Sequence, residues 1–300
     1  MRVFVTGASG FIGSAVLPEL IAEGHEVTGL ARSENAATAV KAAGAQVLRG
    51  DLADLDVLRE GARNADGVIH LAFGHDFTQI EKAVTEDRAA IELFGEVLAD
   101  GPAGQPLVIA SGLLGLTSGQ LAKEDDEFPV TPDPFGARND NARVALALAD
   151  RGVRASSVRL APTVHRADHL GFVGVLADIA RRTGVSGYPG EGDARWPAVH
   201  VQDAARLFRL ALDKAPAGSV LHGADEEGNT IRTYAEVIGR KLDLPVRSIP
   251  DDQLWEHFGW LAPMLTRDVP TASAITRELL GWQPTQPQML DDMENSPALS

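Results

Sequence analysis

Short apolar runs rich in β-branched residues alternate with amphipathic stretches along the first half of the chain. The apolar runs have the length of buried strands and lie at residues 2–7, 25–32, 45–51, 65–72, 106–112 and 153–162. Between them, patterns with a helical period lie at residues 11–24, 33–44 and 85–100. This alternation predicts βαβ units that build a parallel sheet covered by helices on both faces. We therefore expect an α/β fold with a doubly wound parallel sheet.

The alternation ends near residue 165. A loop, a helix and a Gly- and Pro-rich stretch follow, and a strand-like run then leads into an amphipathic helix at residues 198–218. We expect a larger domain made of residues 1–165 together with about 199–222. A smaller, lid-like substrate-binding subdomain is expected from residues 166–198 and 223–300.

Composition narrows the class of protein. The net charge of −15 disfavours binding to nucleic acid, and no apolar run approaches the ~18 residues of a membrane span. The absence of cysteine excludes disulfides, thiolate nucleophiles and cysteine-built metal sites. The first residues predict a strand that runs into a glycine loop rather than a signal peptide, so we expect a cytoplasmic protein.

The stretch "TGASGFIG", residues 6–13, has glycines at every third position between the first predicted strand and the first helix. Glycine allows a tight turn and a close approach of the backbone to a diphosphate, whose charge then meets the positive end of the helix. A strand before the motif and a helix after it are the context that such a motif requires. The candidate cofactor-binding residues here are Gly7, Ser9, Gly10, Phe11, Ile12 and Gly13.

The end of the second strand selects between cofactors. An NAD site carries an acidic side chain there for the ribose hydroxyls, whereas this chain has Arg32 and Ser33. A guanidinium and a hydroxyl suit a 2′-phosphate better, which predicts NADP(H). Asp51 and Leu52 close the third strand and are expected to meet the adenine.

With these features the chain resembles the short-chain dehydrogenases/reductases, in particular the extended or atypical branch that includes nucleotide-sugar epimerases and dehydratases. The resemblance runs over most of the chain and is carried by "TGASGFIG", "DLAD", "VIHLA", "VIASG", "RLAPTV" and "WPAVHVQDAARLFRLAL". It implies a Rossmann fold, a nicotinamide cofactor and a homodimer formed through the two long helices beside the fifth strand.

The resemblance also implies roles for residues at the ends of later strands. Ser111 matches the active-site Ser/Thr that hydrogen-bonds the substrate oxygen. Further residues implied to line the cofactor, the last group through its backbone, are Leu71, Ala72, Phe73 and Pro162 to Val164.

The Tyr-x-x-x-Lys motif of the family is missing. Its position falls in "PFGARN", where Phe135 replaces the tyrosine and Asn139 replaces the lysine. The tyrosines elsewhere, Tyr188 and Tyr234, have no lysine four residues later. In this family the phenol protonates the forming alkoxide, a contribution of typically ~10²–10⁴-fold, and the lysine grips the ribose. Asn139 is still able to hydrogen-bond a ribose hydroxyl.

Three explanations of this replacement remain open. First, His75 or His165, each after a strand at the edge where such folds bind ligands, replaces the acid. Second, the substrate is an imine, whose iminium carbon accepts hydride without a separate proton donor. Third, the protein binds NADP as a non-catalytic redox sensor.

Two other patterns have competing interpretations. "HRADH" has the spacing of a metal site, but it follows a predicted strand rather than lying in a helix, so we expect no metal. Aromatic residues in the second half form either a substrate surface or a second core; they are Tyr188, Trp196, Trp255, Phe258 and Trp260. Arg181, Arg182 and Arg195 leave a nucleotide-sugar substrate possible.

The sequence therefore predicts an NADP(H)-dependent oxidoreductase that transfers hydride to a small carbonyl or imine. Ser111 is expected to hold the substrate, Asn139 the ribose, and His75 or His165 the proton. The alternatives are the redox sensor and a redox-neutral epimerase or dehydratase.

Overall fold

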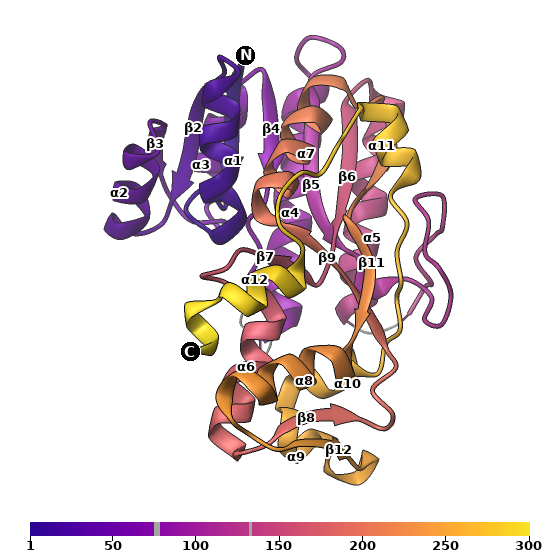
Figure 1. The fold of residues 1–300 in the computed structure, drawn as a ribbon. Helices are drawn as coiled ribbons and strands as arrows, with labels where there is room; N and C mark the ends of the chain where they lie inside the picture. Colours follow the sequence, from indigo (N-terminus) through magenta and orange to yellow (C-terminus); the bar gives the residue numbers. More distant parts are fainter. Residues whose placement is uncertain (75–78, 132–133) are drawn as a thin grey trace.

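The structure is a computed structural model that describes residues 1–74, 79–131 and 134–300, without the side chains of residues 134 and 135. Its larger part is a seven-stranded sheet in which all pairings are parallel (Figure 1). In spatial order the strands are β10 (Ser219–Gly223), β6 (Arg154–Leu160), β5 (Pro106–Gly112), β4 (Gly67–His70), β1 (Arg2–Thr6), β2 (Glu26–Ala31) and β3 (Gln46–Arg49). The predicted doubly wound parallel sheet is confirmed.

Helices cover both faces of this sheet. On one face α1 (Phe11–Ala22) packs against α7 (Val201–Lys214), and on the other face α3 (Leu55–Arg63), α4 (Ile80–Ala99) and α5 (Pro134–Ala147) lie side by side (Figure 1). α2 (Glu34–Ala42) packs on β2 and β3. All residues of β4 are buried, which is why this strand shows no alternation of apolar and polar positions; its polar residue, His70, has buried hydrogen-bond partners.

A smaller lobe lies at the carboxyl edge of the large sheet. It contains a three-stranded sheet, a two-stranded sheet and several helices around a second hydrophobic core. The strands are β7 (Thr163–His165), β9 (Arg195–His200) and β11 (Glu226–Thr230), then β8 (Ser186–Pro189) and β12 (Val246–Ile249). The helices are α6 (Gly171–Thr183), α8 (Ile231–Leu242), α9 (Leu254–Phe258), α10 (Ala262–Leu265) and α12 (Met289–Asn295). The short 3₁₀ helices η2 (Leu113–Gly115) and η3 (Leu148–Arg151) belong to the larger part. The 3₁₀ helices η4 (Asp251–Gln253), η5 (Gly259–Leu261) and η6 (Pro297–Leu299) belong to the smaller lobe.

One segment departs from the expected division into lobes. α11 (Ala274–Leu280) packs against β10 and α7 instead of joining the smaller lobe, and Leu280 and Trp282 are buried in the core of the large sheet. The Trp282 Nε1–H donates to the backbone carbonyl of Asp203 at 2.9 Å. The chain after residue 223 therefore contributes to both lobes, because Leu280 and Trp282 are buried in the larger core.

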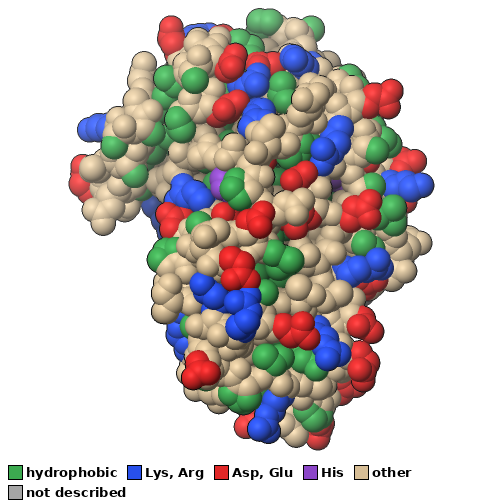
Figure 2. Space-filling model, in the orientation of Figure 1, with side chains coloured by type: hydrophobic (Ala, Val, Ile, Leu, Met, Phe, Trp, Pro, Cys, Tyr) green, Lys and Arg blue, Asp and Glu red, His purple; other side chains and the backbone are tan. Residues whose placement is uncertain are grey.

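The surface is charged and mixed. Figure 2 shows acidic and basic side chains interspersed over one face of the molecule, with hydrophobic side chains only in small groups between them. Among the described residues, none of the helices has both the length and the apolar character needed to cross a bilayer.

Candidate active site

The connection between β1 and α1 forms a turn that only glycine can build. Gly7 has φ +67°, and a Cβ on it would lie 2.8 Å from backbone atoms of Leu71 and Ala72. A Cβ on Gly13 would collide with the carbonyl oxygen of Gly7, across the turn. The Gly10 N–H donates to this same carbonyl at 3.0 Å. These glycines bring the backbone close together at the point where a diphosphate is expected, which fits a dinucleotide.

The N-terminus of α1 is open toward this turn. Its N-cap residue, Gly10, has no side chain to accept a hydrogen bond, and the first turn holds no acidic residue. The positive end of the helix and its first N–H groups are therefore uncompensated by the described side chains, as an anion site requires. Ser9 is exposed at the turn, and Phe11 and Ile12 are half-buried at the start of the helix.

The tip of β2 presents a free guanidinium. Arg32 is exposed and makes no hydrogen bond or ion pair within the described ranges. The Ser33 hydroxyl already has one hydrogen-bond partner, because it caps α2 by accepting the Ala36 N–H at 3.2 Å. Arg49, which pairs with Ala31 in the sheet, donates to the Ser33 carbonyl at 2.7 Å. Arg49 is not among the residues predicted from the sequence, although it stands two residues before Asp51, which is.

The predicted adenine contacts follow β3. Asp51 is exposed and one of its carboxylate oxygens accepts the Ala53 N–H at 3.3 Å, while Leu52 is half-buried. Both residues stand beside the tip of β2, since β2 and β3 are paired in parallel.

A chain of buried polar side chains joins the carboxyl ends of β1 and β4. Thr6 Oγ1 lies 2.7 Å from His70 Nδ1 and accepts the Ala72 N–H at 3.2 Å. On its other side, His70 Nε2 lies 3.1 Å from Asp87 on α4. Asn141 on α5 donates to the second oxygen of Asp87 at 2.7 Å. The chain thereby links two strands to two helices and fixes the backbone of Ala72, one of the residues expected to line the cofactor.

The hydroxyl of Ser111 does not face open space. Ser111 is 6% exposed, and its Oγ lies 2.9 Å from the Oγ of Ser157 on β6 and 3.5 Å from the Val158 carbonyl. A Cβ on the next residue, Gly112, would meet nothing within 4 Å. Because successive side chains in a strand point to opposite faces, position 112 faces the side opposite to Ser111, and the space there is open. This geometry argues against the expected contact between Ser111 and the substrate.

α5 places a cation beside the residue that stands where the family has lysine. Asn139 is 8% exposed and its amide packs on η2, where a Cβ at Gly115 would come 2.6 Å from Nδ2. The preceding residue, Arg138, holds its guanidinium 3.8 Å above the centre of the Phe73 ring. Burial lowers the pKa of this guanidinium and the charge of Asp87 opposes the shift. The side chain of Phe135 lies outside the described part.

The two candidate acids have different outcomes. His75 falls outside the described residues, so it stays a prediction. His165 is fully buried, with its Nδ1 2.7 Å from Asp292 on α12. Burial lowers the pKa of His165 to about 4, so the ring is neutral near pH 7. A neutral ring without exposed surface is unsuited to protonate a substrate, which corrects the expectation for His165.

The connection between β6 and β7 lies where the sequence predicted contacts to the nicotinamide. Pro162 is half-buried, Val164 is 8% exposed, and the Thr163 hydroxyl donates to the Pro197 carbonyl. In the following stretch, Arg166 binds Asp168 through two hydrogen bonds of 2.7 and 2.9 Å. Over the described residues, no group of three or more acidic or histidine side chains could hold a metal ion.

The aromatic residues of the second half divide between core and surface. Trp196 and Phe258 are buried in the second core, as the competing interpretation expected. Trp255 and Trp260 are 69% and 37% exposed, and Phe172 packs between Trp196 and Trp260. Arg195 is held by Asp268 through hydrogen bonds of 2.8 and 2.9 Å, so its charge is already paired.

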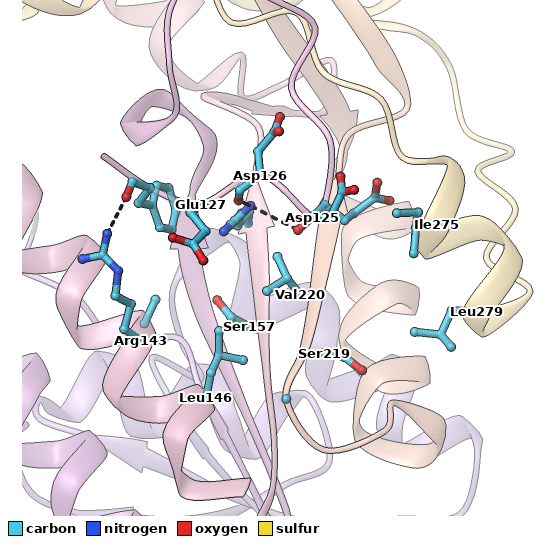
Figure 3. Close-up of a pocket in the computed structure, with 15 residues that line it drawn as sticks. Asp125, Asp126, Glu127, Arg143, Leu146, Ser157, Ser219, Val220, Ile275 and Leu279 are labelled. Atoms are coloured by element: carbon cyan, nitrogen blue, oxygen red, sulfur yellow. Dashed lines mark hydrogen bonds between the residues drawn. The ribbon is translucent and has the colours of Figure 1, made fainter. Parts of the chain in front are cut away.

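A cavity of about 600 Å³ lies away from the residues that are predicted to bind the cofactor (Figure 3). α5, β6, the start of β10 and α11 surround it, and an acidic segment of residues 124–127 borders it. Arg159 lies over the Phe128 ring and donates to the Asp126 carbonyl at 2.8 Å. None of the residues predicted to bind the cofactor lines this cavity.

Comparison with known proteins places these features in context. A model described as the NAD dependent epimerase/dehydratase family matches residues 3–94. An uncharacterized protein of Schizosaccharomyces pombe is 46% identical over 294 residues, 98% of each chain. One of Saccharomyces cerevisiae is 45% identical over 302 residues, 100% of each chain.

Reductases and sugar-modifying enzymes are more distantly similar. The 4-hydroxy-2-methyl-3-oxo-4-farnesyl-3,4-dihydroquinoline-1-oxide ketoreductase of Stigmatella aurantiaca is 29% identical, over 79% of this chain and 72% of its own. The structure of UDP-glucose 4-epimerase with UDP-glucose from Thermotoga maritima has a TM-score of 0.76 at 18% identity and covers 99% of this chain and 97% of that one. That of dTDP-glucose 4,6-dehydratase with NAD from Streptomyces venezuelae has a TM-score of 0.78 at 19% identity, with 99% and 95% covered.

Proposed function

Because the chain belongs to the NAD-dependent epimerase/dehydratase family, within the extended short-chain dehydrogenases/reductases, we propose that it is an NADP(H)-dependent oxidoreductase that reduces a small carbonyl or imine substrate. One observation carries this proposal. The glycine turn between β1 and α1 has the geometry of a dinucleotide site, whereas Phe135 and Asn139 stand where the family has tyrosine and lysine. When bound, the dihydronicotinamide supplies the hydride.

Arg32 supports NADP(H) over NAD(H). Its guanidinium is exposed at the tip of β2 and unpaired within the described ranges, whereas the carboxylate nearest in sequence, Glu34, faces Arg49 at 3.3 Å. A guanidinium binds a phosphate through paired, charge-assisted hydrogen bonds. With the uncharged ribose hydroxyls of NAD(H) it forms only weaker hydrogen bonds. Arg49 is engaged by Glu34 and by the Ser33 carbonyl, so the 2′-phosphate is assigned to Arg32.

Replacing Arg32 by alanine should weaken NADPH binding by about tenfold or more, since a hydrogen bond between charged groups is worth about 1.5–3 kcal/mol. NADH binding should change less than about twofold. Titration calorimetry of the full chain with both cofactors measures this, and Arg63→Ala, at the exposed end of α3, matches the charge change. An equal loss for both cofactors, or tighter NADH binding by the unmodified protein, would reject the assignment.

The residues at the site support reduction rather than a redox-neutral reaction. An epimerase or dehydratase that begins by oxidising a hydroxyl needs a base to take the hydroxyl proton, and neither Phe135 nor Asn139 is a base at neutral pH. In reduction of an iminium substrate the carbon takes the hydride while the C=N electron pair moves to nitrogen, so a neutral amine forms without a proton donor. Reduction of a carbonyl leaves an alkoxide that needs a proton, for which His75 is the remaining candidate. Asn139 remains as a hydrogen-bonding group for the ribose. Arg195, paired with Asp268, gives no free charge for a substrate diphosphate.

The inward-facing Ser111 favours one second candidate, a redox sensor that binds NADP without turnover. Its hydroxyl is engaged by Ser157, so the family's serine, tyrosine and lysine are all absent or turned away. Such a protein would hold NADP(H) tightly and consume none.

The test measures NADPH consumption, with NADH as control, against matched ketones and cyclic imines from pH 5 to 9. Turnover of imines with little turnover of ketones supports a substrate that carries its own positive charge. Turnover of ketones that decreases above a pKa near 6–7 points to a histidine acid, with His75→Gln as the variant that should abolish that decrease. Tight binding of NADPH with no turnover on either panel rejects the reductase in favour of the sensor or a redox-neutral enzyme.

A further inference from the structure

A loop of the smaller lobe contacts the start of the dinucleotide turn's helix. This loop connects β7 to α6, and its His169 ring lies over the Phe11 ring with 3.9 Å between centroids and 35° between planes. The guanidinium of Arg166 lies 5.6 Å from the centre of the same ring. Phe11 is the first residue of α1, next to the N-cap Gly10. Two nitrogen-bearing side chains from the other lobe therefore lie against the side chain of the residue that begins α1.

The loop is held in a defined shape. Arg166 and His169 exchange two backbone hydrogen bonds of 2.9 and 2.8 Å, which close a tight turn. Leu170 anchors the turn in the second core, and Gly171 follows with φ +55°. A Cβ on Gly171 would lie 2.9 Å from the carbonyl oxygen of Val164, so the turn is packed against the preceding strand. The side chains of the loop are thus presented to α1 by a rigid support.

The charge of Arg166 is paired at present with an exposed neighbour. Both oxygens of Asp168 accept hydrogen bonds from this guanidinium, and the two side chains are 43% and 58% exposed. The Asp168 interaction raises the pKa of Arg166, and Asp292 on α12 attracts the same charge. An exposed pair of this kind contributes little stability, so a diphosphate can compete for the guanidinium at small cost.

We propose that Arg166 and His169 bind the cofactor diphosphate, so that a loop of the smaller lobe completes the outer wall of a site whose inner wall is the glycine turn. The proposal rests on the proposed function in needing a dinucleotide, and it holds for NADPH and NADH alike because both contain the diphosphate. A guanidinium and an imidazole N–H supply the two kinds of donor that phosphate oxygens take, and the open end of α1 supplies the rest. In this chain, Arg166 and His169 replace part of the cofactor-binding energy that the family's lysine contributes through its hydrogen bonds to the ribose.

The arrangement also makes cofactor binding join the two lobes. The inner wall belongs to β1 and α1, whereas Arg166 and His169 belong to the segment that carries α6 and the second core. A bound diphosphate then contacts both lobes at once, next to the predicted nicotinamide contacts at residues 162–164.

Titration calorimetry of the full chain with NADPH, NADH and adenosine 2′-monophosphate tests the proposal, because the last ligand lacks the diphosphate. Arg166→Ala should weaken both dinucleotides by about tenfold and leave adenosine 2′-monophosphate unchanged. Asp168→Asn should have the opposite sign and tighten both dinucleotides by about threefold, since it frees the guanidinium. His169→Phe keeps the ring contact with Phe11 and loses the N–H, and it should weaken both dinucleotides severalfold.

Arg181→Ala is the matched control, because Arg181 also pairs with a nearby aspartate, Asp178, and is 41% exposed on the same lobe. It should leave all three ligands unaffected. Binding by Arg166→Ala and His169→Phe that equals that of the unmodified protein, or an equal loss of the dinucleotides and adenosine 2′-monophosphate, would overturn this assignment while the proposed function stands. Failure of the unmodified protein to bind either dinucleotide would overturn the proposed function and this inference with it.

Discussion

Alanine at position 13 is expected to lower the affinity for NADPH by about a hundredfold. A Cβ there would overlap the carbonyl oxygen of Gly7 and lie 2.8 Å from the Ala8 carbonyl carbon. These are backbone atoms of the turn itself, so relief requires that the turn open. Opening withdraws the N–H groups from the diphosphate, and strain of this kind costs about 1–3 kcal/mol, with tenfold in affinity for each 1.4 kcal/mol.

Two further glycine substitutions make the prediction graded. At Gly10 the Cβ would lie 3.2 Å from the same oxygen, so Gly10→Ala should weaken binding by about tenfold. At Gly174, inside α6, the nearest atom would be the Leu170 Cβ at 3.8 Å, and alanine there should leave affinity unchanged and stabilise the helix slightly. Calorimetry gives the affinities and circular dichroism checks that each variant is folded. The same affinity for all three variants would show that the turn does not carry the cofactor.

Acidification from pH 7 to pH 4 is expected to lower the free energy of unfolding by about 3 kcal/mol through His222 alone. This ring is fully buried, its Nδ1–H donates to the Ala272 carbonyl at 2.8 Å, and its Nε2 accepts from Arg159 at 3.4 Å. Both nitrogens are therefore used in a way that only the neutral ring allows. Burial lowers the pKa of His222 from 6.5 to about 4.

The sign follows from the protons bound in each state. Between pH 6.5 and pH 4 the unfolded chain binds a proton at His222 and the folded chain does not, so stability falls with falling pH and levels off above pH 6.5. His165 acts in the same direction, because burial lowers its pKa to about 4 as well. Burial raises the pKa of Asp292 and of Glu226, and these two carboxyl groups act in the opposite direction.

Urea unfolding at a series of pH values measures this dependence, with His222→Asn as the comparison. Asparagine can still donate to the Ala272 carbonyl but does not titrate, so the variant should lose about 3 kcal/mol of the pH dependence whatever its stability at pH 7. Parallel curves for the two proteins from pH 7 to pH 4 would contradict the buried, neutral assignment of His222.

Local pattern predicted much of this architecture. The apolar runs became β1 to β6 in chain order, because apolar and β-branched residues favour strands. The glycine turn was also predictable, because the positive φ at Gly7 and the contact between position 13 and the Gly7 carbonyl are local to the turn. The contact of Gly7 with Leu71 and Ala72 is long-range, and the local pattern did not show it. The expected roles for Asp51, Leu52 and residues 162–164 remain predictions, since they depend on a ligand.

The site side chains were less predictable. Ser111 and Gly112 are neighbours, and only the pairing of β5 with β6 decides which of them faces Ser157. A shift of one residue along a strand reverses the face, so identifying the strand did not decide which way the Ser111 hydroxyl points. His165 was placed at a strand end as expected, but the partner that buries it, Asp292, lies 127 residues later in the chain.

The sequence by itself determined the sheet, the order of its elements along the chain and the glycine turn, because these depend on periodicity and backbone sterics over a few residues. The tertiary structure alone decided that Ser111 turns inward, that Arg138 lies over Phe73, that α11 returns to the larger core and that His169 meets Phe11. Each of these depends on contacts between segments far apart in sequence. Burial and charge are properties of the packed neighbourhood, and no local pattern encodes which distant segment will supply it.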